Sequence, residues 1–446
     1  MFRLKPSYKY LKEKMPLLYM FYKWLFRLWK TVKYYSLIKK SKNLDELTVE
    51  RIKNNEKPLK VLFFVIHESV WKLETVYKKM ESDSDFHPII VICPYINAGE
   101  DTMNRDMNKA FTYFNDNGYN VKKAIDENGG VINLKHDLKP DIIFFTNPHD
   151  LTFKEFQAEN YLDVLSIYIP YSHQVSKYDD YQPQYNQLFH NLMWKIFTTN
   201  SLDKQIFKKY SERKGANVIA TGYPGIEYLL ESNRVVNDVW KRQGKVKKKI
   251  IYAPHHTIDD NCSLGYSTFL KYSAAMLDFV EEFSESVQFA FKPHPLLRDK
   301  LANDNVWGKE ATDKYFDFWQ SQENTQLEDG EYLDLFLQSD AIIHDSGSFL
   351  AEYLYVNKPC LYLLSNGKVA LPYNPFGVLC LKVYDICYEK SEIESFILTV
   401  INGSDTSALA RSKFIKEHLL TFEDDLVPSD LILKHLRNEL IANKNV

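Results

Sequence analysis

The apolar positions of the chain gather in short continuous runs, and helix-like segments separate these runs. Runs of this length are typical of parallel strands that are buried on both faces. In the first half the runs are Val61–Ile66, Pro88–Cys93, Asp141–Phe145 and Val164–Ile169. In the second half they are Ile250–Ala253, Val287–Phe291, Ala341–Ile343 and Cys360–Leu364. This repeated alternation of strand and helix predicts an α/β fold with doubly wound sheets.

The two series of strands predict two Rossmann-like domains that face each other across a cleft. A chain of 446 residues exceeds the size of one ordinary core. The polar, lysine-rich segment Lys241–Lys249 separates the two series. We expect an N-terminal arm over 1–57, domains over 58–240 and 241–405, and terminal helices over 406–446. In such sheets, ligands bind beyond the carboxyl ends of the strands.

A basic segment rich in aromatic residues precedes the first predicted strand. Residues 1–42 hold twelve Lys or Arg and one acid, a net charge of +11, although the whole chain carries −3. On a helix over 16–37, Lys23, Arg27, Lys30 and Lys33 share one side, and apolar side chains fill most of the rest. This pattern is typical of a helix at the interface of an anionic membrane. A helix packed on the body with a solvated basic face has the same pattern.

Composition excludes several classes of protein. There is no uncharged apolar run of about 18 residues, so we expect no transmembrane helix. The first residues lack the apolar core and cleavage site of a signal peptide. Five scattered cysteines without CxxC spacing indicate reduced thiols rather than disulfides or zinc. The reduced thiols indicate a cytoplasmic protein. The acidic body carries no recognition motif, so we expect no nucleic-acid partner.

The segment HDSGSF, from His344 to Phe349, directly follows the predicted strand Ala341–Ile343 and precedes a predicted helix over Leu350–Val356. Its small residues allow a ligand to approach the backbone, and serine hydroxyls can cap the helix, which leaves amide N–H groups to hold a phosphate. An ordinary capped turn has the same residues. The expected donor-binding residues here are His344, Asp345, Ser346, Gly347 and Ser348, with Glu352 near ribose hydroxyls.

Two further motifs follow predicted strands in the second half. Lys292 and His294 belong to KPHP, in which two prolines hold one histidine at a strand end. Such a histidine suits hydrogen bonding to a phosphate or protonation of a leaving group. His255 and His256 follow the strand Ile250–Ala253. Adjacent histidines are a poor metal signature, so we expect phosphate contacts and no metal, although an ordinary loop has the same residues.

In the first half, Tyr171, Ser172 and His173 follow the predicted strand Val164–Ile169. This loop is expected to face the motifs of the second half across the cleft. Either Tyr171 or His173 can then activate an acceptor hydroxyl. The turn TGYPG at 221–225 is expected where the chain passes between the domains, with either a structural role or a direct role in the site.

Taken in order, these motifs resemble the CDP-glycerol glycerophosphotransferase family, which includes teichoic-acid polymerases and their capsule and lipopolysaccharide relatives. The resemblance covers residues 160–400, through TGYP at 221, YAP at 252, KPHP at 292 and HDSGSFLAEYLYVNKP at 344. VWKLETVYKKM, from Val70, is similar to capsule and lipopolysaccharide members. The resemblance implies the two-domain GT-B fold and transfer of glycerol phosphate, or a similar polyol phosphate, from a CDP-linked donor to a glycan or polyol-phosphate acceptor.

The resemblance also implies that CMP leaves, that no cofactor or metal takes part, and that His294 is a catalytic or pyrophosphate-binding histidine. Two positions depart from the family pattern. The usual Trp-His-Gly of the first domain is replaced by Tyr171–Ser172–His173, and Thr-Trp-Arg after YAP is replaced by His255–His256–Thr257. Two alternatives therefore stay open, a GT-B glycosyltransferase that uses a sugar nucleotide and an inactive donor-binding scaffold protein.

Overall fold

The structure is a computed structural model of the whole chain. It describes residues 16–55, 57–97, 99–126, 129–231, 234–259, 264–364, 372–420 and 426–441, and the side chains from residue 32 onward within these ranges.

The N-terminal domain is built on a parallel sheet of seven strands in the order β3-β2-β1-β4-β5-β6-β7. The strands are β1 (Leu59–Val65), β2 (Phe86–Ile92), β3 (Val121–Lys123), β4 (Ile142–Phe145), β5 (Leu165–Tyr168), β6 (Lys195–Thr198) and β7 (Val218–Ala220). In the central strand β1, every residue from Val61 to Val65 is buried, because helices cover both faces of the sheet. Strands β1 and β4 pair in parallel. The order of the strands changes direction between them, because β2 and β3 follow on one side of β1 and β4 to β7 follow on the other.

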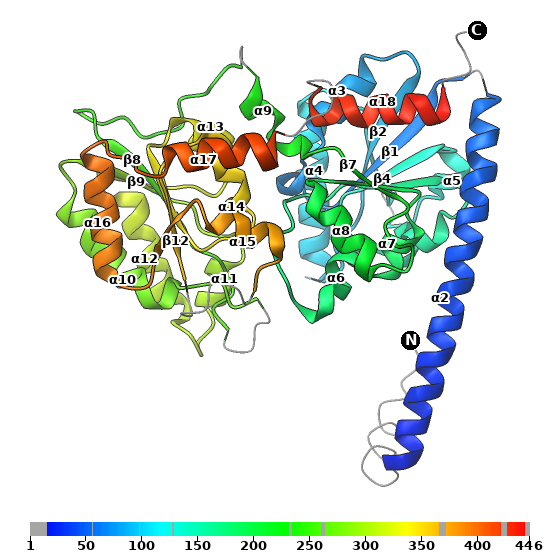
Figure 1. Cartoon of the computed structure of the whole chain (residues 1–446), viewed down its shortest axis with the longest axis horizontal. Helices are drawn as coiled ribbons and strands as arrows, with labels where there is room; N and C mark the ends of the chain where they lie inside the picture. Colours follow the sequence, from blue (N-terminus) through cyan, green and yellow to red (C-terminus); the bar gives the residue numbers. More distant parts are fainter. Residues whose placement is uncertain are drawn as a thin grey trace.

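The C-terminal domain repeats this arrangement with a parallel sheet of six strands, in the order β10-β9-β8-β11-β12-β13. The strands are β8 (Lys248–Ala253), β9 (Val287–Phe291), β10 (Thr325–Leu327), β11 (Ala341–His344), β12 (Cys360–Leu363) and β13 (Asp385–Cys387). Figure 1 shows the two domains side by side. The predicted fold of two doubly wound α/β domains is confirmed.

Helices cover the faces of both sheets. Those between the strands of the N-terminal domain are α3 (Glu74–Glu81), α4 (Glu100–Asp116), α5 (Leu134–Asp137), α6 (Gln182–Tyr185), α7 (Leu188–Leu192) and α8 (Ser201–Tyr210), and α9 (Glu227–Leu230) follows β7. Those of the C-terminal domain are α10 (Phe269–Glu282), α11 (Leu297–Leu301), α12 (Gly308–Ser321), α13 (Leu333–Gln338), α14 (Phe349–Glu352), α15 (Pro375–Leu381) and α16 (Lys390–Ile401).

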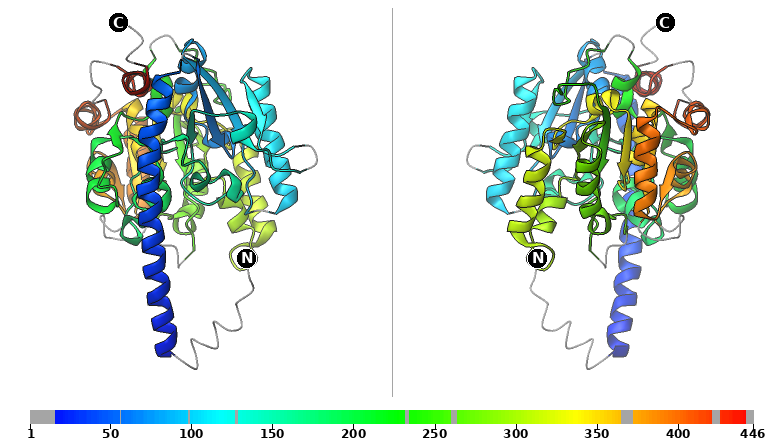
Figure 2. Two further views of the ribbon diagram at one scale, coloured as in Figure 1. Left: turned by 90° about the vertical axis from the view of Figure 1, so that its right-hand side faces the viewer. Right: turned by 90° about the vertical axis from the view of Figure 1, so that its left-hand side faces the viewer.

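A single long helix, α2 (Pro16–Lys53), begins the described chain. Its second half packs on the N-terminal domain, where the Ser41 hydroxyl donates to Leu192 O at 3.1 Å and Ile52 enters the core. Its first half extends beyond the body of the protein (Figures 1 and 2). The side chains of 16–31, which include most of the predicted cationic stripe, lie outside the described residues. Within the described chain, no helix is both long and apolar enough to cross a membrane.

The last two α-helices of the described chain pack on different domains. Helix α17 (Ala408–Phe414) adds Phe414 to the core of the C-terminal domain. Helix α18 (Pro428–Leu440) returns to the N-terminal domain (Figure 1), where Ile432 and Leu436 are fully buried. The carboxylate of the buried Glu227 accepts from the backbone N–H and the hydroxyl of Ser429, both at 2.6 Å. Helix α18 therefore contacts both the core of the N-terminal domain and the segment after β7 by which the chain leaves this domain.

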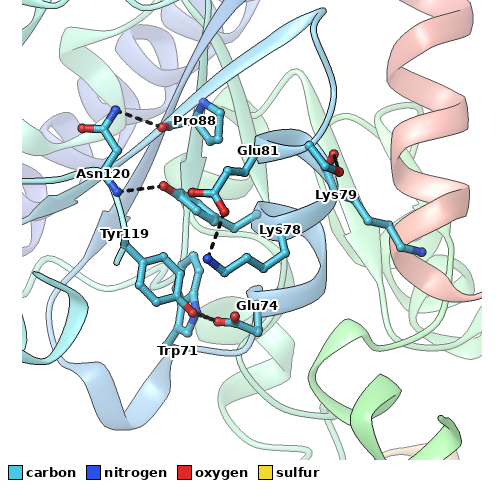
Figure 3. A network of polar contacts seen from close by, with 10 residues as sticks. Trp71, Glu74, Lys78, Lys79, Glu81, Pro88, Tyr119 and Asn120 are labelled. Atoms are coloured by element: carbon cyan, nitrogen blue, oxygen red, sulfur yellow. Dashed lines mark hydrogen bonds and ion pairs between the residues drawn. The ribbon is translucent and has the colours of Figure 1, made fainter. Parts of the chain in front are cut away.

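The segment VWKLETVYKKM forms α3 and the turn before it. Glu74 accepts from the indole N–H of Trp71 at 2.8 Å and from the hydroxyl of Tyr119 (Figure 3). Asn120 N–H donates to the hydroxyl of Tyr77 at 3.1 Å. These bonds join α3 to the chain that enters β3. The segment that resembles capsule and lipopolysaccharide members therefore includes residues that stabilise the N-terminal domain.

Candidate functional site

A cavity of about 190 Å³ lies between the two domains, at the carboxyl ends of both sheets. The N-terminal domain lines it with the loop after β5, from Tyr171 to Ser176, and with Pro148 and His149 after β4. The C-terminal domain lines it with His255 after β8, His294 after β9 and Ser346–Ser348 after β11. The strand-end motifs that the sequence places far apart therefore meet in one cleft, as expected for open parallel sheets.

Three imidazoles cluster on the C-terminal side of this cleft: His255 and His294 line it, and His256 packs against both without being one of its lining residues. The ring centroids of His256 and His294 are 4.1 Å apart, and those of His255 and His256 are 4.4 Å apart. His294 N–H donates to Pro254 O at 3.0 Å, so the loop after β9 is held directly against the loop after β8. KPHP and YAPHH thus build one site.

The hydrogen bonds of these rings determine which nitrogen carries the proton. Leu296 N–H donates to Nδ1 of His294 at 3.2 Å, so in the neutral ring Nε2 bears the hydrogen. The Thr257 hydroxyl oxygen accepts from the N–H groups of Tyr266 and Ser267, and its own hydrogen is then directed to Nδ1 of His255 at 3.0 Å. His255 and His294 therefore both present an Nε2–H donor.

Burial keeps the three rings neutral. It lowers the pKa of His294 to about 3 and that of His256 to about 4, and the charges of nearby lysines such as Lys300 act in the same direction. The pKa of His255 falls to about 2, first through burial and then through the two neighbouring rings. An anion in the cleft would meet neutral N–H donors and, by its own charge, favour their protonation.

The spacing of the three rings also fits a metal ion, since their ligand atoms lie within 4.8 Å of one another. A metal-bound histidine usually donates its other ring N–H to an acceptor. In His255 and His294 the other nitrogen, Nδ1, is an acceptor from the Thr257 hydroxyl and from Leu296 N–H. If Nε2 of both rings bound a metal, each Nδ1 would carry a hydrogen that faces one of these donors. The donor set therefore fits an anion better than a metal.

The loop Ser346–Ser348 contributes backbone to the cleft at a close approach. A Cβ on Gly347 would lie 3.2 Å from the ring of Tyr266 and 3.7 Å from a methyl group of Val175. The helix that follows is short, with α14 over Phe349–Glu352 and a 3₁₀ turn over Tyr353–Val356 in place of the predicted continuous helix. The expected serine cap is wrong for Ser348, since its side chain caps no N–H group.

Asp345 and His344 lie behind the loop, fully buried. The carboxylate of Asp345 accepts from His255 N–H at 2.5 Å and from the hydroxyl of Thr268 at 2.8 Å. Nδ1 of His344 accepts from Ser346 N–H at 3.2 Å. Both residues fix the loops that carry the cleft-lining groups, and their predicted direct contact with a donor stays a prediction.

Glu352 and Lys292 are likewise buried and are not among the described residues that line the cleft. Glu352 accepts from the hydroxyl of Tyr332. Burial raises the pKa of Glu352. Burial also lowers the pKa of Lys292, against the opposite effect of the negative charges of Glu328 and its acidic neighbours. Their predicted contacts with donor groups also stay predictions.

His173 reaches the cleft from the N-terminal domain but is almost completely buried. Its Nε2 lies 3.3 Å from the hydroxyl of Tyr355, and Phe376 packs beside the ring. Burial lowers the pKa of His173 to about 3, and its Nδ1 has no hydrogen-bond partner in the described structure. The ring sits at the junction of the domains, and its predicted role as a base remains a prediction.

Backbone contacts beside His173 join the two domains. Lys177 N–H donates to Pro372 O at 2.7 Å, and Asn374 N–H donates to Val175 O at 2.8 Å. A Cβ on Gly377 would lie 2.5 Å from Val175 O, so this approach requires glycine. The loop after β5 therefore has a fixed place opposite the C-terminal imidazoles.

Sequence reasoning missed His149, which follows β4 by four residues and lines the cleft. Its position after a strand end, the signal used for the other motifs, would have found it. Gln187 Nε2 lies 3.3 Å from Nδ1 of His149, and burial lowers the pKa of this ring.

Comparison with known proteins agrees with this architecture. The chain has the two-domain fold of GT-B type enzymes. Residues 171–367 match the model of the family described as CDP-glycerol:poly(glycerophosphate) glycerophosphotransferase. This segment contains TGYP, YAP, KPHP and HDSGSF, so the match agrees with the family that these motifs predict. A search of curated proteins found no match.

Among solved structures, the wall teichoic acid polymerase TagF has a TM-score of 0.54 at 13% identity, covering 94% of this chain and 98% of that chain. A UDP-N-acetylglucosamine 2-epimerase has a TM-score of 0.56 at 15% identity, covering 88% and 98%. The UDP-GlcNAc 2-epimerase from Neisseria meningitidis, bound to UDP-GlcNAc, has a TM-score of 0.52 at 15% identity, covering 85% and 100%. At these identities the likeness establishes the fold.

Proposed function

We propose that this protein transfers glycerol phosphate, or a similar polyol phosphate, from a CDP-linked donor to a growing cell-surface glycan or polymer and releases CMP. The observation that carries the proposal is the group of three neutral imidazoles, two of which line the cleft, within the segment that matches the family. Their N–H donors and the amides of Ser346–Ser348 suit the diphosphate of such a donor.

The reaction joins the two sides of the cleft. An acceptor hydroxyl oxygen forms a bond to the phosphorus that carries glycerol. The bond from this phosphorus to the bridging oxygen breaks, and CMP leaves with the electron pair. His294 and His255 stabilise the charge that develops on the diphosphate oxygens, and the proton of the hydroxyl passes to a base, for which His173 is our candidate. Phosphoryl transfer depends mainly on positioning and electrostatic stabilisation, which this cleft supplies.

The donor is tested by incubating the purified protein with CDP-glycerol, CDP-ribitol, UDP-glucose and UDP-N-acetylglucosamine and measuring the released nucleotide. We expect CMP from a CDP-polyol and no nucleotide from the UDP-sugars. Consumption of a UDP-sugar alone would support the sugar-nucleotide glycosyltransferase instead. Tight binding of CDP-glycerol without CMP release, in the presence of glycan and polyol-phosphate acceptors, would support the scaffold protein.

We also propose that residues 16–37 hold the protein on an anionic membrane surface, which would place it peripherally on the inner face. The support is the sequence of this segment and the extension of α2 beyond the body (Figure 2). Each basic residue near an anionic surface contributes about 1 kcal/mol of attraction.

Reversing the four charges by Lys23→Glu, Arg27→Glu, Lys30→Glu and Lys33→Glu should therefore weaken binding to phosphatidylglycerol vesicles by about a hundredfold or more. Vesicle co-sedimentation at low and high salt measures the effect, since salt screens it. The matched control is Lys204→Glu with Lys208→Glu on α8, both exposed, and it should bind nearly as the native protein does. Equal binding by the fourfold variant would refute the proposal.

A further inference from the structure

A second cavity, of about 450 Å³, lies within the N-terminal domain beside the inter-domain cleft. It is situated beyond the carboxyl ends of β1 and β4, and Phe64, Phe145 and Phe156 form part of its wall. Tyr34 of helix α2 also lines it. This is the size and the position of a small-ligand site in an open α/β sheet.

The charge of this cavity is opposite to that of a phosphate site. Asp150 and Glu159 line it, and none of the described residues that line it is Lys or Arg. His149, the remaining ionisable group of basic type, has its pKa lowered by burial and is neutral at pH 7. A polyol-phosphate chain carries a negative charge on every unit, and two carboxylates without a cation repel it.

The polar groups of the cavity suit hydroxyl groups instead. Side-chain amides at Asn147, Gln157 and Gln187 offer both donors and acceptors, and the carboxylates accept from hydroxyls. The hydroxyl of Thr152, also in the lining, is buried and has no hydrogen-bond partner within the described structure. Aromatic rings beside such groups match the apolar faces and the polar edges of a sugar ring.

The cavity adjoins the cleft. His149 and Pro183 line both of them. A ligand that fills the cavity can therefore extend one end past His149 toward the imidazoles of the C-terminal domain. This is the direction from which an acceptor hydroxyl must approach a donor held by those imidazoles.

We propose that this cavity is the acceptor site and that it takes a neutral, hydroxyl-rich sugar chain rather than a polyol-phosphate chain. The inference rests on the proposed transfer reaction and narrows its acceptor. Asp150, Glu159 and the amides bind the sugar hydroxyls, and the carboxylates reject phosphate.

The test uses the full-length protein and two kinds of probe. The neutral probes are methyl β-glycosides of glucose, galactose and N-acetylglucosamine and their β-linked disaccharides, and the anionic probe is a synthetic tri(glycerol phosphate). Affinities are measured by calorimetry and by saturation-transfer NMR. We expect at least one neutral probe to bind in the millimolar range or tighter, and more tightly than tri(glycerol phosphate).

The double variant Asp150→Lys/Glu159→Lys should weaken binding of that neutral probe by about tenfold or more, because hydrogen bonds to charged acceptors are lost. It should also strengthen binding of tri(glycerol phosphate). Both side chains are exposed, so the fold is expected to persist. The control Glu155→Lys/Asp137→Lys makes the same charge change at exposed positions outside the lining, and it should bind both probes as the native protein does.

Tighter binding of tri(glycerol phosphate) than of every neutral probe by the native protein would overturn the inference, and so would neutral-probe binding that the double variant leaves unchanged. CMP release from CDP-glycerol by the native protein reports the transfer reaction separately. If CMP is released with tri(glycerol phosphate) as acceptor and no neutral probe binds, the acceptor inference fails alone. If neutral probes bind as expected and no CDP-polyol is consumed, the transfer reaction fails and the sugar site stands.

Discussion

Replacing His294 by alanine is expected to lower CMP release from CDP-glycerol by about a hundredfold or more while the fold persists. The substitution removes one Nε2–H donor from the group of three imidazoles. Loss of a single donor at a site where charge develops costs about 10²–10³ in rate. Because the ring is only partly buried, thermal unfolding should change little. The measurement is CMP release at saturating donor, with the melting temperature recorded in parallel.

The conservative variant His294→Gln tests the role of the N–H group. The amide nitrogen of glutamine lies close to where Nε2 was, so this variant should retain more activity than His294→Ala. The matched control is His136→Ala, which removes an exposed histidine of the N-terminal domain and should leave activity unchanged. Near-native turnover by His294→Ala would remove His294 from the mechanism.

The sequence predicts the strands that are buried on both faces, because burial there requires a continuous run of apolar residues. The strands Val61–Ile66 and Val287–Phe291 lie in sheet interiors, and their apolar runs match β1 and β9. The missed strands are β6 and the edge strands of the two sheets, β3, β7, β10 and β13. The edge strands are three residues long, and the interior strand β6 begins and ends on a polar residue, Lys195 and Thr198. An edge strand is covered less and paired on one side, so it carries no continuous apolar run.

The return of helix α18 to the N-terminal domain was also beyond the sequence. Its apolar positions, such as Ile432 and Leu436, indicate a helix with one buried face, but periodicity does not say which domain buries it. The contact depends on Glu227, which is about 200 residues away and meets Ser429 only in the folded chain.

In the candidate site, the sequence predicts which loops meet, because parallel strands bring their carboxyl ends to one edge. It does not predict the direction of each side chain. His344 ends β11 and packs against Tyr362 and Tyr384, whereas His294, three residues beyond β9, reaches the cleft. Nor does it predict the protonated nitrogen of each ring, which depends on Thr257 and on the N–H of Leu296.

The second large effect is expected at Asp345, through stability as well as activity. Its carboxylate is completely buried and accepts from two backbone N–H groups and a hydroxyl on two loops, at His255 and Thr268. In Asp345→Asn an amide NH₂ must face at least one of these donors, so a buried donor loses its acceptor and meets another donor. Leaving such a group unpaired costs about 1–3 kcal/mol, and more where a charged partner is lost.

We therefore expect Asp345→Asn to lower the free energy of unfolding by about 3 kcal/mol, as measured by urea denaturation of the native protein and the variant. CMP release should fall with it, since Asp345 holds the loop that carries His255. The control Asp299→Asn makes the same change at an exposed position of α11 and should leave both measurements unchanged. Loss of activity at native stability would instead mean that Asp345 contacts the donor itself, as the sequence predicts, and native values for both would show that its hydrogen bonds support neither the fold nor the site.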